Sequence, residues 1–228
     1  MAQWIYGKNT VREALLHRRV KKIGIIPTFS DASILALITE QHLPVERMSA
    51  QRLDDLAQGS HQGIIADIKP FSYTPMDTWL TSISQKVNPL VVILDEVQDP
   101  QNLGAIILKK HQQVEVTPTV MKIASGAIEH LAIIQVTNLS NAMTELKDKG
   151  FWIASTSLTD AIDYRAFDYR GPIAVIFGSE GQGVSPLVNQ RADVRIRIPL
   201  SPKLESFNVA SSVAIVLAEV YRQRFPLK

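Results

Sequence analysis

Apolar residues recur in short blocks along the first part of the chain, and these blocks predict a compact α/β unit over about residues 1–70. Apolar runs bounded by turn residues predict three strands, at 23–26, from Val45 onward, and at 63–68. Helical spacing behind a capping residue predicts three helices, at 11–16, 31–41 and 51–56, with caps at Thr10, Asp31 and Ser49.

This pattern breaks at 70–89, where three prolines and several Ser and Thr residues surround one short helical stretch, 76–84. We place a domain boundary there, with an N-terminal domain at 1–72, a linker at 73–88 and a second domain at 89–228. From Leu90 onward strands and helices alternate, which predicts a mostly parallel sheet. The expected strands are 90–94, 133–136, 151–155, 173–177 and 194–198, and the expected helices are 119–130, 140–149, 184–190 and 207–224.

The composition is ordinary for a globular protein, with 46% hydrophobic and 20% charged residues among 228. The absence of cysteine excludes disulfides, thiolate metal ligands and thiol nucleophiles, and it fits a reducing cytoplasm. The first residues carry no basic segment followed by an apolar run, which is the pattern of a secretory signal. No stretch approaches the roughly 18 apolar residues of a membrane span, so we expect a cytoplasmic protein without a membrane segment.

Net charge says little about partners, because it is only +2, with a sequence pI near 8.8. The basic residues are nevertheless clustered, at 17–22 and at Arg191, Arg195, Arg197 and Lys203. Each cluster is compatible with an RNA partner, and equally with a solvated helix end or strand edge.

Several common chemistries are disfavoured by the motifs. The glycine loop 178–183 reads G-x-x-G-x-G, which is neither the dinucleotide fingerprint nor a P-loop, and taken alone it is a tight strand-to-helix turn. The five histidines are far apart in sequence with no H-x-x-x-H pair, so we expect no metal site. No G-x-S-x-G elbow is present, which disfavours a serine hydrolase.

Two strand ends turn into small, polar loops near the C-terminus. One is the apolar run 173–177 that leads into the glycine loop, and the other is 196–200, followed by 205–214 at the start of the last helix. Loops of this kind at neighbouring strand ends predict one pocket for a small ligand with adenine-like and carboxylate groups.

The order of these segments resembles a known family. Its motifs are matched by the blocks 94–105, 176–183, and 198–200 with 206–209, and more weakly by 117–127 and 136–138. They resemble the SpoU (TrmH/RlmB-like) RNA ribose 2'-O-methyltransferases of the SPOUT class. The segments 5–15 and 60–64 are similar to the small RNA-binding domain of RlmB-like members.

The resemblance implies an α/β fold with a mostly parallel sheet, a C-terminal deep trefoil knot and a small N-terminal L30e-like α/β domain that binds the substrate. The knot would form an S-adenosylmethionine pocket and much of a homodimer interface. The implied cofactor-binding residues are Gly178, Ile198, Leu200, Phe207, Asn208, Val209, Thr137 and Asn138. The family usually has Leu at the position of Phe207, and either residue supplies an apolar cover for the adenine.

The same resemblance suggests the residues that act on the RNA. A ribose hydroxyl is a poor nucleophile until its proton is drawn off, so polar groups must assist. The implied catalytic residues are Asn102, Glu180, Ser206 and Asn208, and the implied RNA-binding residues are Arg18, Arg19, Lys21, Lys22 and His61. Each polar candidate also has a structural interpretation: Asn102 as a helix cap, Ser206 as an N-cap, Asn208 as a first-turn residue, and Glu180 as a solvated loop carboxylate or the partner of a nearby arginine.

One departure from the family is serious. The family follows its first motif with two apolar residues and an arginine thought to activate the ribose hydroxyl, whereas here Ile106 and Ile107 are followed by Leu108, Lys109 and Lys110. The arginine is absent, and so are about a dozen residues that should finish a helix and begin a strand, although a parallel crossover needs about that many. The gap is either a loop left out of the sequence, which we favour, or a true deletion.

We therefore expect an S-adenosylmethionine-dependent enzyme that methylates a ribose 2'-hydroxyl in structured RNA, a guanosine of 23S ribosomal RNA. The alternatives are a catalytically silent RNA-binding or ribosome-assembly protein on the same fold, or an enzyme acting on transfer RNA or an antibiotic-resistance site. The silent protein is supported only by the missing arginine.

Overall fold

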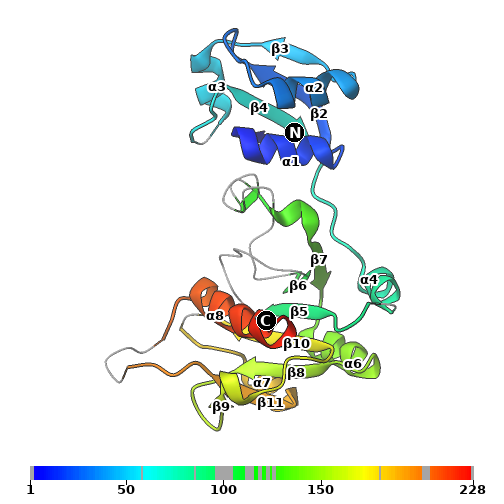
Figure 1. Ribbon diagram of the computed structural model, residues 1–228, viewed down its shortest axis with the longest axis vertical. Coiled ribbons are helices and arrows are strands. Elements are labelled where there is room, and N and C mark those ends of the chain that lie inside the picture. Colours follow the sequence, from blue (N-terminus) through cyan, green and yellow to red (C-terminus); the bar gives the residue numbers. More distant parts are fainter. Residues whose placement is uncertain are drawn as a thin grey trace. The chain divides into compact units, whose positions relative to one another are not determined.

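The structure is a computed structural model that describes residues 3–57, 59–84, 86–95, 105–110, 116–117, 120–121, 124, 127–179, 181–201 and 206–226 (Figure 1). The chain divides into two compact units. Unit 1 comprises Met1–Ser72 with Glu115–His130, and unit 2 comprises Tyr73–Val114 with Leu131–Lys228.

Unit 1 is built on a four-stranded mixed sheet with three helices. Its strands are β1 (Gln3–Tyr6), β2 (Val20–Ile25), β3 (Val45–Arg47) and β4 (Ile64–Ile68), in the order β1-β4-β2-β3. β4 runs antiparallel to both of its neighbours, and β2 and β3 are parallel. The helices are α1 (Lys8–Leu16), α2 (Ala32–Glu40) and α3 (Ala50–Leu56), and the short 3-10 helix η1 (Ala127–His130) also belongs to this unit.

Two of the three predicted caps in unit 1 are confirmed. The Asp31 carboxylate accepts a hydrogen bond from the Ile34 amide, and the Ser49 hydroxyl accepts one from the Arg52 amide, both at 3.3 Å. The cap at Thr10 is wrong, because Thr10 is buried inside α1 and Gly7, with φ of 90°, precedes the helix. A positive φ suits glycine, which has no Cβ to clash, so the backbone here starts the helix without a side-chain cap. Strand β1 was also not predicted from the sequence.

Unit 2 contains a seven-stranded sheet in the order β7-β6-β5-β10-β8-β11-β9. Its strands are β5 (Leu90–Asp95), β6 (Ala105–Lys109), β7 (Ala132–Val136), β8 (Trp152–Thr156), β9 (Ile162–Asp163), β10 (Ile173–Gly178) and β11 (Val194–Arg197). Every pairing between them is parallel, as predicted, so their carboxyl ends lie along one edge.

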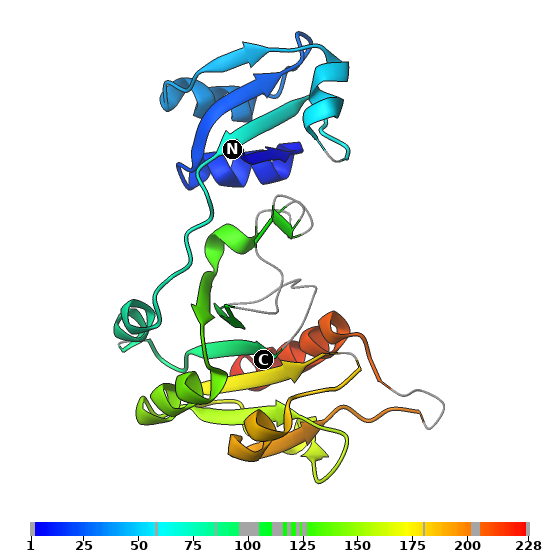
Figure 2. The same ribbon diagram turned by 180° about the vertical axis from the view of Figure 1, so that it is seen from behind.

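Helices cover this sheet on both faces (Figures 1 and 2). They are α4 (Met76–Ile83), α6 (Leu139–Asp148), α7 (Pro186–Arg191) and α8 (Val209–Arg224), with a 3-10 turn η2 (Tyr164–Ala166). Residues of α4, α6 and α7 form one core cluster with alternate residues of the strands, among them Ile93 and Ile176. Side chains alternate along a strand, so Val175 and Phe177 of β10 face the opposite side, where α8 packs on β10.

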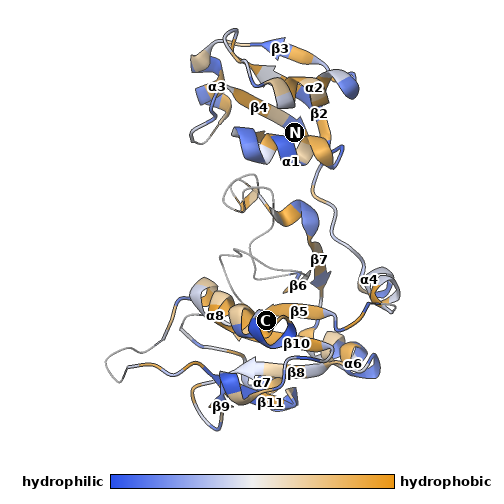
Figure 3. Ribbon diagram, in the orientation of Figure 1, coloured by the Kyte–Doolittle hydropathy of each residue, from blue (hydrophilic) through white to orange (hydrophobic). Residues whose placement is uncertain are grey.

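The apolar runs of the sequence become the buried strands, and Figure 3 shows β4, β5 and β10 among the more apolar segments. Burying one such Val, Ile or Leu side chain is worth about 1.5–3 kcal/mol.

The strand β6 was missing from the prediction, which treated residues 105–109 as the edge of a gap. In the structure it pairs with β5 and β7, so the sheet is continuous there with only nine residues, 96–104, between β5 and β6.

The remaining helix predictions in unit 2 agree closely with the structure. The helix predicted at 119–130 belongs to unit 1; part of it lies outside the described residues, and its last four residues form η1. No helix in the described ranges is long and apolar enough to cross a membrane. The trefoil knot stays a prediction.

Candidate functional site

A pocket of about 560 Å³ opens where three strands of unit 2 end. β10, β8 and β11 are neighbours and parallel, so the loops that follow them meet at one edge of the sheet. The sequence order of the strands reverses at β10, which lies between β5 and β8, and ligands of open α/β sheets bind at such switch points. The lining residues come from these strand ends, the glycine loop and the start of α8: 156–158, 177–179, 181–184, Asn189, 196–198, Leu200, Ser206, Phe207, Val209 and Ser212.

The glycine loop folds back on itself at the wall of this pocket. The Ser179 amide donates to the Gly183 carbonyl at 3.1 Å, and the Gly183 amide donates to the Ser179 carbonyl at 2.9 Å. Gly183 has φ of +66°, which favours glycine, and a side chain on Gly178 would collide with the backbone of Gly183 and Val184. The glycines therefore allow a tight loop whose backbone faces the pocket.

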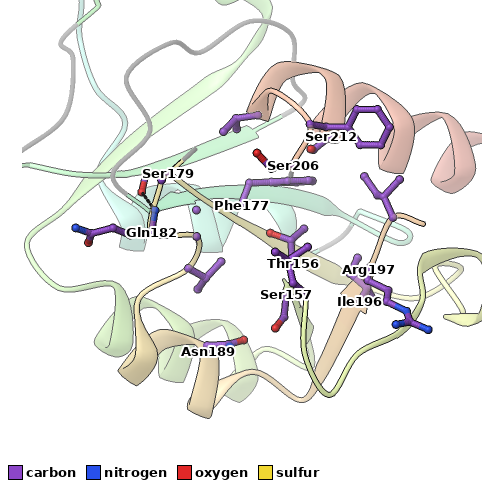
Figure 4. A pocket seen from close by; sticks show the side chains of 18 of the residues that line it. Thr156, Ser157, Phe177, Ser179, Gln182, Asn189, Ile196, Arg197, Ser206 and Ser212 are labelled. Carbon is purple, nitrogen blue, oxygen red and sulfur yellow. Dashed lines mark hydrogen bonds between the residues drawn. The ribbon is translucent and has the colours of Figure 1, made fainter. Parts of the chain in front are cut away.

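Polar side chains approach the pocket from different elements (Figure 4). The Asn189 side chain of α7 is held by the buried Ser155 hydroxyl, with 2.5 Å between the two oxygens. The Thr156 hydroxyl donates to the Ile176 carbonyl of the neighbouring strand at 3.1 Å. Ser206 and Ser212 lie on the α8 side, and Arg197 extends at the rim away from Ser179 and Gln182.

The structure brings most of the predicted cofactor residues together. Gly178, Ile198, Leu200, Phe207 and Val209 all line the pocket, although they are spread over 32 positions from 178 to 209. Among the candidates that do not line it are Thr137 and Asn138, and the Asn138 side-chain oxygen instead caps α6 by accepting from the Ser140 and Asn141 amides.

The predicted catalytic residues are placed only in part. Ser206 lines the pocket, whereas Asn102 and Glu180 lie outside the described residues. Asn208 is the N-cap of α8, where its side-chain oxygen accepts from the Ala210 amide at 2.8 Å and the Ser211 amide at 3.3 Å. The alternative role of N-cap, expected for Ser206, therefore belongs to Asn208.

Sequence reasoning missed the pocket residues contributed by β8 and α7. Thr156 and Ser157 stand at the end of β8, and Asn189 lies inside α7. The sequence did contain one indication, because the run of small polar residues after the strand 151–155 resembles the polar loops that follow the other two strand ends. No motif pointed to Asn189, which reaches the pocket only because α7 packs beside β8.

The predicted RNA-binding residues differ in exposure and in the contacts that their side chains make. Arg18 and Lys21 are exposed, whereas Lys22 forms an ion pair with Glu46. The Arg19 guanidinium is mostly buried, pairs with Glu129, donates to the Lys69 carbonyl and stacks on Phe71. His61 bridges the Gly63 amide and the Asp54 carboxylate.

Two histidines that are distant in sequence meet in unit 1. His17 and His130 have ring centroids 4.9 Å apart in a T-shaped arrangement, and His130 Nε2 lies 3.1 Å from Glu13 Oε2. The ligand atoms of Glu13, His17 and His130 lie within 4.8 Å of one another, a spacing that a metal ion can bridge. The sequence separation of the histidines therefore did not predict their separation in space.

Two family models match this chain. The model of the SpoU rRNA Methylase family matches residues 89–218, and a model described as RNA 2'-O ribose methyltransferase substrate binding matches residues 4–74. The chain belongs to the SpoU family. This membership confirms the expectation of an RNA methyltransferase.

Curated SpoU relatives match over nearly their whole length. A protein named as a TrmH family tRNA/rRNA methyltransferase in Staphylococcus epidermidis is 37% identical over 241 residues, covering 98% of this chain and 97% of the relative. A protein of the same name in Staphylococcus aureus is 38% identical over 237 residues, covering 96% of each. The first alignment is 13 positions longer than the chain (241 against 228), so the relative carries residues that this chain lacks.

Solved SpoU structures share the fold. The SpoU methyltransferase AviRb from Streptomyces viridochromogenes, in complex with the cofactor AdoMet, superposes with a TM-score of 0.82 at 18% identity, covering 99% of this chain and 91% of that one. The AdoMet-bound rRNA methyltransferase from Sinorhizobium meliloti gives 0.81 at 21% identity, with coverages of 100% and 88%. S-adenosylmethionine is the methyl donor of this family, in agreement with the cofactor expected from the sequence.

Proposed function

We propose that this chain transfers a methyl group from S-adenosylmethionine to a ribose 2'-hydroxyl of structured RNA, at a guanosine of 23S ribosomal RNA. The observation that carries the proposal is the pocket at the ends of β8, β10 and β11, bounded by the glycine loop and by Ser206, Phe207 and Val209. Membership of a family whose model is described as an rRNA methylase supports ribosomal RNA, while the staphylococcal relatives are named for both transfer and ribosomal RNA.

The pocket has the size and chemistry for this cofactor. Ligand sites of this kind span about 300–1,000 Å³ and combine apolar walls with a few placed polar groups. The apolar walls are Phe177, Val184, Ile196, Ile198, Leu200 and Phe207, and the open backbone of the glycine loop offers hydrogen-bonding groups without side chains in the way. When bound, S-adenosylmethionine supplies an electrophilic methyl group, so the site needs no metal ion for this reaction.

The task of the protein residues is to hold the ribose hydroxyl in line and to help remove its proton. Ser206 lines the pocket beside Phe207, and Asn208 follows as the N-cap of α8. We assign the orientation of the ribose to Ser206 and Asn208, together with Asn102 and Glu180. The homodimer and the trefoil knot expected for the family belong to the same proposal, as does a cytoplasmic location.

RNA contacts in unit 1 are assigned to Arg18, Lys21, Lys22 and His61. Arg18 and Lys21 are the exposed arginine and lysine of the basic cluster, and exposed cations bind phosphates with a strong dependence on salt. Arg19 was proposed with them from the sequence, but its pairing with Glu129 favours a role in holding η1 against the rest of unit 1.

A second function is favoured by one specific observation, the missing arginine. Lys109 is the cation at the corresponding end of the motif, but its ammonium lies 2.6 Å from the buried Asp95 carboxylate and is not placed to replace it. A chain that binds cofactor and RNA without transferring the methyl group would act as a silent RNA-binding or ribosome-assembly protein.

Two measurements separate these functions. Calorimetry with S-adenosylmethionine tests the pocket, and absence of binding by the intact protein would contradict both the cofactor and the reaction. Transfer of a tritiated methyl group to unmodified 23S ribosomal RNA, with transfer RNA in parallel, tests the substrate. Label in ribosomal RNA, located on a ribose 2'-oxygen, supports the proposal. Label in transfer RNA instead would make transfer RNA the substrate. Cofactor binding without label in either RNA favours the silent protein.

A further inference from the structure

A buried ion pair joins two strand ends beside the pocket. Asp95 is the last residue of β5 and is only 1% exposed, and Lys109 is the last residue of the adjacent strand β6. The register pairs Leu94 with Leu108, so Asp95 and Lys109 occupy the next matched position. Lys109 Nζ lies 2.6 Å from Asp95 Oδ1.

The other oxygen of the same carboxylate holds the end of the glycine loop. Asp95 Oδ2 accepts a hydrogen bond from the Ser185 amide at 2.9 Å. Ser185 directly follows Val184, the last pocket-lining residue of the loop, and is the N-cap of α7. On its other side Asp95 is aligned in register with Gly178, where the loop begins. The loop is thus fixed at both ends next to one carboxylate.

This arrangement requires a cation. A buried carboxylate without a counter-charge is strongly destabilising, and removing one partner of a buried pair costs far more than replacing both. Burial alone raises the pKa of Asp95, but the contacts with Lys109 and with Ser185 outweigh it and hold that pKa below its ordinary value. Lys109 therefore keeps Asp95 charged and able to accept from Ser185.

We propose that Lys109 is a positioning residue for the cofactor pocket, acting through Asp95 on the Ser185 amide and so on the shape of the glycine loop. The inference rests on the proposed function for the identity of the cofactor. In this role Lys109 shapes the glycine loop, whereas the arginine that the family has after this motif is thought to activate the ribose hydroxyl.

The test measures the Kd for S-adenosylmethionine by calorimetry, and the Tm without ligand, in full-length variants. Lys109→Met removes the charge and keeps the length, and we expect a Kd at least tenfold higher. The matched control is Lys110→Met, an exposed neighbour, which should leave the Kd within twofold. Lys109→Arg keeps the charge and should retain most of the affinity.

A second-site variant shows whether Lys109 acts through Asp95. In the double variant Lys109→Met with Asp95→Asn no buried charge is left, and the Asn oxygen still accepts from Ser185, so most of the affinity should return. A double variant as weak as Lys109→Met would mean that Lys109 acts directly, and it would overturn the proposal.

Two further outcomes complete the test. If Lys109→Met does not fold, the test compares two double variants, Lys109→Met with Asp95→Asn and Lys109→Met with Asp95→Leu. Both lack the buried carboxylate charge, and only the Asn variant offers an acceptor for the Ser185 amide. The Leu double should bind at least tenfold more weakly than the Asn double, and equal affinities would overturn the proposal. A lower Tm with an unchanged Kd in Lys109→Met would show a purely structural pair and also overturn it. Failure of the wild type to bind would instead remove the proposed function, and this inference with it.

Discussion

Gly178 and Gly183 are packed backbone to backbone: a Cβ atom on Gly178 would lie 1.9 Å from the carbonyl carbon of Gly183 and 2.0 Å from its oxygen. These backbone atoms cannot move away from an added Cβ atom as the end of a flexible side chain can. The close approach holds together the two ends of the loop that lines the pocket.

The first prediction concerns this contact. Gly178→Ala should force the loop apart, weaken S-adenosylmethionine binding at least about tenfold and cost about 1–3 kcal/mol of stability through overpacking. Calorimetry and urea unfolding measure the two effects. Gly171→Ala is the matched control, because a Cβ there meets nothing within 4 Å. Wild-type affinity in Gly178→Ala would show that the loop does not shape the cofactor site.

A second prediction separates the two roles of Asn208. Asn208→Ala should lower methyl transfer at least tenfold, and the lost N-cap should cost about 1 kcal/mol of stability. Asn208→Asp keeps the acceptor for the Ala210 and Ser211 amides but loses the amide group, so it should fold normally and still transfer poorly. Ser49→Ala removes the N-cap of α3 in unit 1 and is the control for stability alone. Full activity in both Asn208 variants would contradict the catalytic role.

The basic cluster supplies a third prediction. Replacing Arg18 and Lys21 by Ala should weaken RNA binding and reduce the slope of log K against log salt by roughly 0.7–0.9 for each phosphate that is no longer neutralised. Arg19→Ala should instead lower the free energy of unfolding, because it leaves Glu129 buried without its partner, and should leave the salt slope unchanged. An unaltered slope in the double variant would show that Arg18 and Lys21 belong to a solvated surface and do not bind RNA phosphates.

A fourth prediction follows from the pKa of Asp95, which is lowered in the folded protein. Its contribution to stability is therefore present above the ordinary carboxyl pKa and is lost as the pH falls through the folded value. In Lys109→Met, burial without the cation raises this pKa. The effect of pH on the stability contributed by Asp95 then changes sign, and stability is lost as the pH rises. Urea unfolding of both proteins between about pH 3 and about pH 8 should therefore show the stability advantage of the wild type growing as the pH rises; parallel curves would contradict the pairing.

The fifth prediction concerns Arg224 at the end of α8. Its guanidinium donates to three carbonyls at 2.7–2.8 Å, those of Tyr169, Asn88 and Gly171. Arg224→Ala leaves these acceptors unpaired and should cost about 2 kcal/mol or more in urea unfolding. Arg170→Ala removes an exposed arginine paired two residues away and should change stability by less than about 0.5 kcal/mol.

Local sequence was sufficient wherever one residue and its immediate neighbours decide the conformation. Asp31 and Ser49 were predicted as caps because a short polar side chain can reach an amide three residues ahead. Long apolar runs such as 173–177 were predicted as strands because a fully buried strand needs apolar residues on both faces. Thr10 failed because the neighbouring Gly7 could start the helix through its backbone alone.

What the tertiary structure decided depends on residues that meet only after folding. The motifs identified the pocket residues 178, 198 and 207, but the parallel order β10-β8-β11 places Thr156 and Asn189 beside them. Strand β6 was hidden by the gap in its motif and is defined only by pairing with β5 and β7. The Lys109–Asp95 pair depends in turn on that register. Local propensity is set by neighbours in sequence, whereas strand order and side-chain contacts are set by the packing of the whole sheet, which no single segment encodes.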